Sequence, residues 1–129
     1  MVVKRHLGVL AGVLALMSLA GVANAHHSAA QYDFRTTGTV TGVIKYVRFA
    51  NPHGKLVLEV TDEHGTRDID YETHSRNNMI RQGLLPEMFH VGDTITINFA
   101  TLRAGGDGGY VTGLLTDDGK TVGQITAPD

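Results

Sequence analysis

Cysteine and tryptophan are absent from this chain of 129 residues, and proline occurs only three times. Without cysteine the chain forms no disulfide bond, and metal sites built on thiolates are excluded. A long hydrophobic run is also missing. The longest, residues 7–22, has 16 residues, whereas a membrane-spanning helix needs about 18 or more. These absences argue against a disulfide scaffold and a cysteine metal centre, and leave little support for a spanning helix.

The first 25 residues have the pattern of a secretory signal peptide. Lys4 and Arg5 give a basic start, the apolar run follows, and residues 23–25 read Ala-Asn-Ala, a small-x-small cleavage site. An uncleaved membrane anchor is the alternative. We expect cleavage after Ala25, no stable membrane insertion afterwards, and a mature protein in the periplasm or secreted. The mature chain then begins at His26.

Positive charge is scarce in the expected mature chain. Taking 25 residues from 129 leaves 104, with nine basic and 13 acidic residues and a net charge of −4. Binding to a phosphate backbone depends on clustered lysine and arginine. We therefore expect no nucleic-acid partner.

Alternation of apolar and polar residues predicts a mainly β domain over residues 37–129, after an arm at 26–36 that has no clear period. Ser75 can cap a helix over residues 77–81 that ends at Gly83, and Pro86 starts a further helical turn. Three strands, one short helix and two or three strands is the order of a small five- to six-stranded OB-like Greek-key barrel. A simple antiparallel meander is the alternative. The expected strands are residues 39–49, 55–61, 67–73, 94–102 and 110–115, with a short sixth at 121–125.

The tight connection between the first two strands is Asn51-Pro52-His53-Gly54. Proline second and glycine fourth suit a type I turn. In the first strand, a bulge or bend at Gly42 would explain why neither alternate set of residues is purely apolar. In the third strand, Asp68, Asp70 and Glu72 are expected to line the solvated face.

A series of short motifs runs through nearly the whole mature chain. They are Ala-His-His-Ser at 25–28, Gly-Thr-Val at 38–40, Phe-Ala-Asn-Pro-His at 49–53, Ser-Arg-Asn at 75–77, Gly-Asp at 92–93 and Asp-Gly-Lys at 118–120. With these motifs the chain resembles a family of exported bacterial proteins known only as a domain of unknown function. It departs from the family pattern at Phe49, where tryptophan is common. The resemblance implies a compact β-barrel and export, and it implies no activity.

Up-and-down strand order sorts the loops between the two ends of the barrel. His64 and His90 are expected at one end. The other end should form a ligand-binding rim, since the loops joining strands 1–2 and 4–5 flank the ligand face of OB-type barrels. The expected rim residues are Asn51, Pro52, His53, Arg103 and Asp107, with His74 on the same rim.

The mature amino terminus is a candidate metal site. The α-amine and imidazole of His26 can chelate one ion, His27 adds a second imidazole, and His53 or His74 could complete the site. Nitrogen ligands of this kind favour Cu(II), the tightest divalent binder of the first-row metals, and zinc is the other candidate. The alternative is that His26 and His27 belong to a solvated tail.

Enzyme chemistry finds little support in the mature chain. It has two serines, Ser28 and Ser75, and no Gly-x-Ser-x-Gly motif. We expect a non-enzymatic exported protein that binds a small ligand or a metal ion, copper or zinc. The alternative is a structural or interaction module whose acidic face meets an envelope protein partner.

Overall fold

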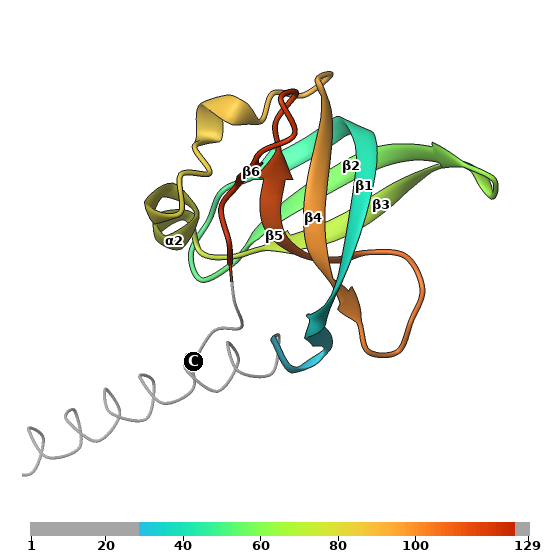
Figure 1. The fold of residues 1–129 in the computed structure, drawn as a ribbon, viewed down its shortest axis with the longest axis horizontal. Coiled ribbons are helices and arrows are strands. Elements are labelled where there is room, and N and C mark those ends of the chain that lie inside the picture. Colours follow the sequence, from blue (N-terminus) through green and yellow to red (C-terminus); the bar gives the residue numbers. More distant parts are fainter. Residues whose placement is uncertain (1–28, 126–129) are drawn as a thin grey trace, which may run out of the picture. The chain divides into compact units, whose positions relative to one another are not determined.

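The computed structural model describes residues 29–125, in which six strands form one sheet (Figure 1). The strands are β1 (Tyr32–Arg48), β2 (Gly54–Asp62), β3 (Gly65–Thr73), β4 (Thr94–Leu102), β5 (Gly109–Leu115) and β6 (Thr121–Val122). One short helix, α2 (Arg76–Arg81), and one 3-10 turn, η1 (Pro86–Met88), lie between β3 and β4 in the sequence. No helix within residues 29–125 has the length and apolar character needed to cross a membrane. The expected signal peptide lies outside the described residues.

The sheet closes on itself. Its order is β3-β2-β1-β4-β5-β6, and an additional pairing joins β3 to β5. This closing pair is parallel and short, with Tyr71 opposite Gly109 and Glu72 opposite Tyr110. The ring confirms the OB-like barrel rather than an open antiparallel meander.

Strand β1 is longer than expected because it serves both halves of the ring. Its carboxyl-terminal part pairs with β2, and its longer amino-terminal part pairs with β4. It begins at Tyr32, so residues 32–36 of the expected arm belong to the sheet. The alternation that would mark this start is hidden by a register shift between Asp33 and Thr37.

The expected bulge at Gly42 lies elsewhere. The β1–β2 register shifts between Ile44 and Tyr46, so Lys45 is the irregular residue. Gly42 has a different role, since a Cβ there would lie 2.8 Å from the backbone oxygen of Glu59. Glycine at this position allows β1 and β2 to approach closely and does not mark a bend.

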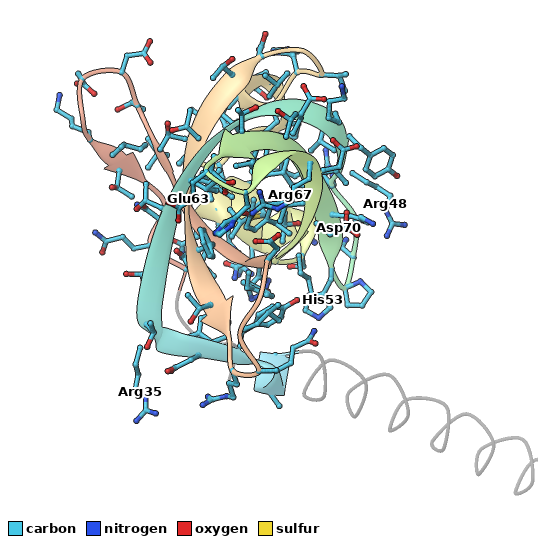
Figure 2. All side chains as sticks on the ribbon, turned by 90° about the vertical axis from the view of Figure 1, so that its right-hand side faces the viewer. Arg35, Arg48, His53, Glu63, Arg67 and Asp70 are labelled. Atoms are coloured by element: carbon cyan, nitrogen blue, oxygen red, sulfur yellow. The ribbon has the colours of Figure 1, made fainter. Side chains whose placement is uncertain are left out.

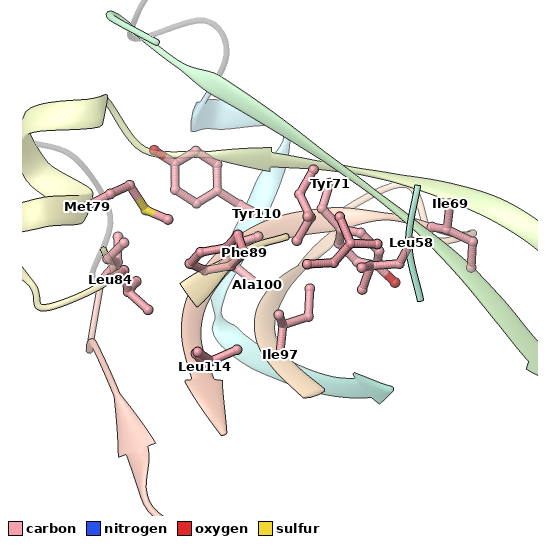
Figure 3. Packing of buried hydrophobic residues seen from close by; sticks show 14 of the residues in the cluster. Leu58, Ile69, Tyr71, Met79, Leu84, Phe89, Ile97, Ala100, Tyr110 and Leu114 are labelled. Carbon is pink, nitrogen blue, oxygen red and sulfur yellow. The ribbon is translucent and has the colours of Figure 1, made fainter. Parts of the chain in front are cut away.

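The core fills the barrel from the inner faces of the strands. Leu56, Leu58 and Ile69 are buried as the alternation predicts. Figure 3 shows side chains from the helical segments, Met79 among them, packed with those of the strands in one cluster. The fold therefore depends on aliphatic and aromatic packing.

Helix α2 matches its expected cap. The Ser75 hydroxyl accepts a hydrogen bond from the backbone N–H of Asn78, and Gly83 takes φ +81° just beyond the end of the helix. Met79 is the buried residue of this helix. Because six residues are too few for an independent helix, this contact holds it on the barrel.

Candidate functional site

The connection between β1 and β2 carries His53 at the end of the barrel. The Asn51–Pro52 peptide is cis, in the connection for which the sequence predicts a type I turn. The backbone N–H of Arg76 donates to the Ala50 carbonyl at 2.9 Å, which ties the connection to the start of α2. Next to His53, Gly54 is buried so closely that a Cβ would meet the Arg48 carbonyl and the Thr73 hydroxyl. These contacts fix the backbone on both sides of His53.

His53 faces a carboxylate on β3. Its Nδ1 lies 3.2 Å from Glu72 Oε1, and each side chain is 17% exposed. The hydroxyl of Tyr32 donates to the other carboxylate oxygen, Oε2, at 2.9 Å. Burial, followed by the interaction with Glu72, raises the pKa of Tyr32, so its hydroxyl stays protonated as a donor. Side chains from β1 and from the β1–β2 connection thus meet at one carboxylate on β3.

Two more rings complete the cluster. The ring centroids of His53, His74 and Tyr110 are separated by 6.3, 6.2 and 6.1 Å and form a nearly equilateral triangle. His74 Nδ1 accepts a hydrogen bond from the backbone N–H of Ser75 at 2.7 Å, which requires an unprotonated Nδ1. Burial, then the neighbouring His53 and Arg81, lowers the pKa of His74. His74 is therefore neutral at pH 7.

Three polar atoms of this cluster are buried without a hydrogen-bond partner among the described residues. They are both ring nitrogens of His53 and the hydroxyl oxygen of Tyr110. The contact of His53 Nδ1 with Glu72 has the distance of an ion pair but not the alignment of a hydrogen bond. Buried polar atoms in native proteins are nearly always hydrogen-bonded. Atoms left unpaired here therefore call for a partner of another kind, such as water, an ion or a ligand.

A pocket of about 320 Å³ opens beside this cluster. Figure 2 shows His53, Asp70 and Arg48 on one side of the barrel, around this opening. Both signs of charge line the pocket, because basic residues come from β1 and β2 and acidic residues from β3. Its polar lining includes Tyr32, Arg48, His53, Lys55, Asp70 and Glu72.

The expected rim is only partly assembled. His53 and His74 come together, and Asn51 and Pro52 are exposed in the same connection. Arg103 lies beside the start of β1, because its backbone N–H donates to the Gln31 carbonyl at 2.9 Å.

Asp107 does not join His53. It accepts hydrogen bonds from Arg67 Nε at 2.6 Å and Nη2 at 2.9 Å, and Arg67 also holds Asp62. Arg67 precedes Glu72 on β3 by five residues, roughly 17 Å along an extended strand. The β4–β5 loop doubles back along β3, with Gly108 packed against the Asp70 carbonyl. Strand order alone does not reveal this return.

The metal prediction is only partly addressed by the described residues. His26 and His27 lie outside them. Within residues 29–125, no group of three or more histidine or carboxylate side chains is placed to hold a metal ion. His53 and His74 are neighbours, but the Nδ1 of His74 is occupied by the Ser75 N–H.

Sequence reasoning missed Glu72, Tyr32 and Tyr110 as site residues. The sequence predicts Glu72 on a solvated face, and it does point outward, but Tyr32 and His53 cover it. The sequence predicts Tyr32 in the arm. Tyr110 lies opposite Glu72 across the closing β3–β5 pair, on the same outward side of the sheet. A buried tyrosine pair at a strand start carries no motif that would identify it.

Solved structures of single-stranded DNA-binding proteins resemble this fold. The mitochondrial single-stranded DNA-binding protein of S. cerevisiae aligns with a TM-score of 0.46 and 8% identity, over 70% of this chain and 96% of that chain. A single-stranded DNA-binding domain from Synechococcus sp. aligns with a TM-score of 0.40 and 10% identity, over 60% and 91%. The expected exclusion of nucleic-acid partners is corrected by this finding, because proteins with this fold include binders of single-stranded DNA. At such identity the likeness concerns the fold alone and assigns no activity to this chain.

Sequence comparison defines the family. No curated protein is significantly similar to this chain. A family of unknown function, DUF6152, matches residues 13–111, which is most of the sequence and includes the motifs from Gly38 to Asp93. The chain therefore belongs to DUF6152.

Proposed function

We propose that this protein is an exported binding protein, and that the pocket beside His53 and Glu72 holds a small polar molecule. One observation carries the proposal. Both ring nitrogens of His53, which lines the pocket, are buried without a hydrogen-bond partner among the described residues, and so is the hydroxyl of Tyr110, whose ring lies against His53.

The energetic argument concerns these unpaired atoms. A buried polar group without a partner costs about 1–3 kcal/mol of stability. A molecule with hydroxyl, amine or amide groups in the pocket would supply partners and recover part of that cost. Such a ligand stabilises the folded state, and the stabilisation grows with the logarithm of its concentration once this exceeds the dissociation constant. The unpaired atoms therefore favour binding over an empty pocket.

The residues around the pocket are also preorganised by contacts within the protein. Gly54 and the hydrogen bond from Arg76 to Ala50 fix the backbone of the His53 connection. Tyr32 holds Glu72 from the other side. Since these groups are already ordered, little conformational entropy is lost when a small molecule binds.

The proposal is of binding rather than catalysis. Ser75, the one serine within residues 29–125, uses its hydroxyl to cap α2. The pocket's polar groups include carboxylates, an imidazole, a guanidinium, an ammonium and phenols, which suit hydrogen bonding to a ligand.

Export is proposed from the amino-terminal sequence alone. The basic start, the apolar run and Ala-Asn-Ala at 23–25 support it. Amino-terminal sequencing of the protein from a periplasmic fraction tests it. A chain beginning at His26 is expected, and a chain retaining Lys4 and Arg5 would contradict export by cleavage.

The binding proposal is tested by NMR of the mature chain with ¹⁵N-labelled histidine. Small carboxylates, phosphates, amines and sugars are added one at a time, followed by Zn(II) and Cu(II), because His26 and His27 offer additional nitrogen ligands. We expect at least one organic compound to move the imidazole signals of His53 and His74. A response from the metals alone would replace the proposed ligand with an ion.

The controls lie in the same spectra. His64 and His90 are exposed, with side chains 71% and 66% accessible, and should not respond. Glu72→Gln should abolish the response of His53. If no compound moves His53, or if all four histidines move together, the proposed site is wrong.

A further inference from the structure

We propose that the molecule in this pocket carries an anionic group held by Arg48 and a flat apolar body that lies against Tyr46. This inference rests on the proposed function and specifies the chemistry of the ligand. It concerns the outer face of β1 and β2, next to the His53 cluster.

The first observation is a pair of like charges. Arg48 on β1 and Lys55 on β2 stand directly opposite each other in the antiparallel register, and both line the pocket. Like charges opposite one another destabilise a sheet. Asp70 offsets only the Lys55 charge, and an anion bound beside Arg48 would reduce the remaining repulsion, so the arrangement favours an anionic ligand.

The second observation separates the two cations. Lys55 Nζ is already paired with Asp70 at 2.6 Å. Among the described residues, no carboxylate lies within ion-pair distance of Arg48, which is exposed at the mouth of the pocket. Arginine can bind a carboxylate or a phosphate through two parallel hydrogen bonds. Arg48 is therefore the residue that remains available for an anionic group.

The third observation is an exposed aromatic ring. Tyr46 is 46% exposed and lies two residues before Arg48 on β1. Side chains two apart on a strand share a face, about 7 Å from each other. Val57 lies opposite Tyr46 in the register and extends the apolar surface. A ligand bound at Arg48 can rest its flat side there.

Acidic residues limit where the anion can bind. Asp70, Asp68 and Glu59 occupy the same outer face on β3 and β2. Their charges repel an anionic group from the rest of the face, and Glu72, opposite Lys55 in the register, keeps it on the Arg48 side of the pocket. The site thus fits one anionic group with an attached ring.

Benzoate and phenyl phosphate are the probes, and benzyl alcohol is the neutral control with the same ring. Binding is followed by amide chemical shifts of the mature chain at low salt. We expect both anions to shift residues 46–48 and 53–55, and benzyl alcohol to bind at least about tenfold more weakly. The ratio between the two anions separates a preference for carboxylate from one for phosphate.

Two variants and a matched control assign the groups. Arg48→Gln should weaken both anions about tenfold, and Tyr46→Leu should weaken them less. Arg35→Gln removes another exposed arginine, well away from the pocket (Figure 2), and should change nothing. Equal loss in Arg48→Gln and Arg35→Gln would show nonspecific charge attraction and overturn the inference.

The outcomes distinguish this inference from the broader proposal. If compounds move His53 while benzoate and phenyl phosphate bind no better than benzyl alcohol, the pocket is correct and the anion assignment is wrong. If nothing moves His53, both are wrong. Much tighter binding of a thymidine oligonucleotide than of phenyl phosphate would assign the face to single-stranded nucleic acid and overturn the small-molecule inference.

Discussion

At the scale of single residues, His74 makes the stability of the fold depend on pH. Burial keeps its pKa below the ordinary value of 6.5 in the folded state. As pH falls below that value, the unfolded chain binds the proton first, so stability is complete above pH 6.5 and is lost at lower pH. His74→Gln should remove part of this loss.

The measurement is the urea midpoint at about pH 7.5 and about pH 5.5. The difference between the urea midpoints at the two pH values should be smaller in His74→Gln than in the parent chain. His64→Gln is the control, because that side chain is 71% exposed. An unchanged pH dependence in His74→Gln would mean that another group is responsible.

The hydroxyl of Tyr110 gives a second prediction at this scale. It is buried without a hydrogen-bond partner among the described residues, so Tyr110→Phe should raise the free energy of unfolding by about 1 kcal/mol in the absence of ligand. Tyr46→Phe, at an exposed ring, should change it by less than about 0.5 kcal/mol. A clear loss of stability in Tyr110→Phe would show that the hydroxyl has a partner.

Gly54 gives a third prediction, on the backbone beside His53. A Cβ at this position would collide with the Arg48 carbonyl and the Thr73 hydroxyl, so Gly54→Ala should destabilise the fold by roughly 3 kcal/mol. Gly65→Ala meets no atom within 4 Å and strains only its positive φ, which costs about 1–2 kcal/mol. Thermal unfolding of both variants compares them, and equal losses would mean that crowding at Gly54 is relieved by backbone movement.

At the scale of elements, the sequence predicts regular strands well and irregular ones poorly. β2 and β4 alternate cleanly, and their structural bounds lie within a residue of the expected ones. β1 fails at its start, because the irregularity after Asp33 breaks the period. β6 ends at Val122 rather than at residue 125, because the next residue, Gly123, takes φ +79°.

The site was harder to predict than the strands. The meeting of His53 and His74 follows from strand direction, which alternation provides. The positions of Glu72, Tyr32 and Asp107 depend on which segments fold back over the barrel, and local patterns carry no information about such long-range packing. Arg67 makes the decisive contact for Asp107 through its guanidinium, and it looks like any strand arginine in the sequence.

Arg67 gives a prediction about the loop between β4 and β5. It joins Asp107 in that loop to Asp62 on the β2–β3 hairpin. The same β4–β5 loop has glycines 105, 106 and 108 at positive φ. Arg67→Ala should therefore speed amide hydrogen exchange in residues 103–108 while leaving β2 protected.

Arg35→Ala is the matched control for this experiment, since Arg35 makes one exposed ion pair within its own strand. It should leave exchange in the loop unchanged. If Arg67→Ala also leaves it unchanged, the glycine-rich loop is held by its backbone contacts, such as Gly108 against Asp70, and not by the arginine.

At the scale of the barrel, its closure and the candidate site occupy the same place. β3 and β5 share only two residue pairs, and one of them joins Glu72 to Tyr110. Tyr32, His53 and His74 cover this junction from outside the ring. A polar molecule bound there would contact both strands, so ligand binding should protect the β3–β5 junction against exchange.

The most direct measurement is a map of amide and imidazole chemical shifts over the mature chain during titration with benzoate. The account predicts that the shifted residues are confined to 46–48, 53–55, 70–74 and 110, with His53 among them. Shifts centred on another pocket, whose lining includes Phe34 and Ile125, or spread evenly over exposed lysines and arginines, would contradict it.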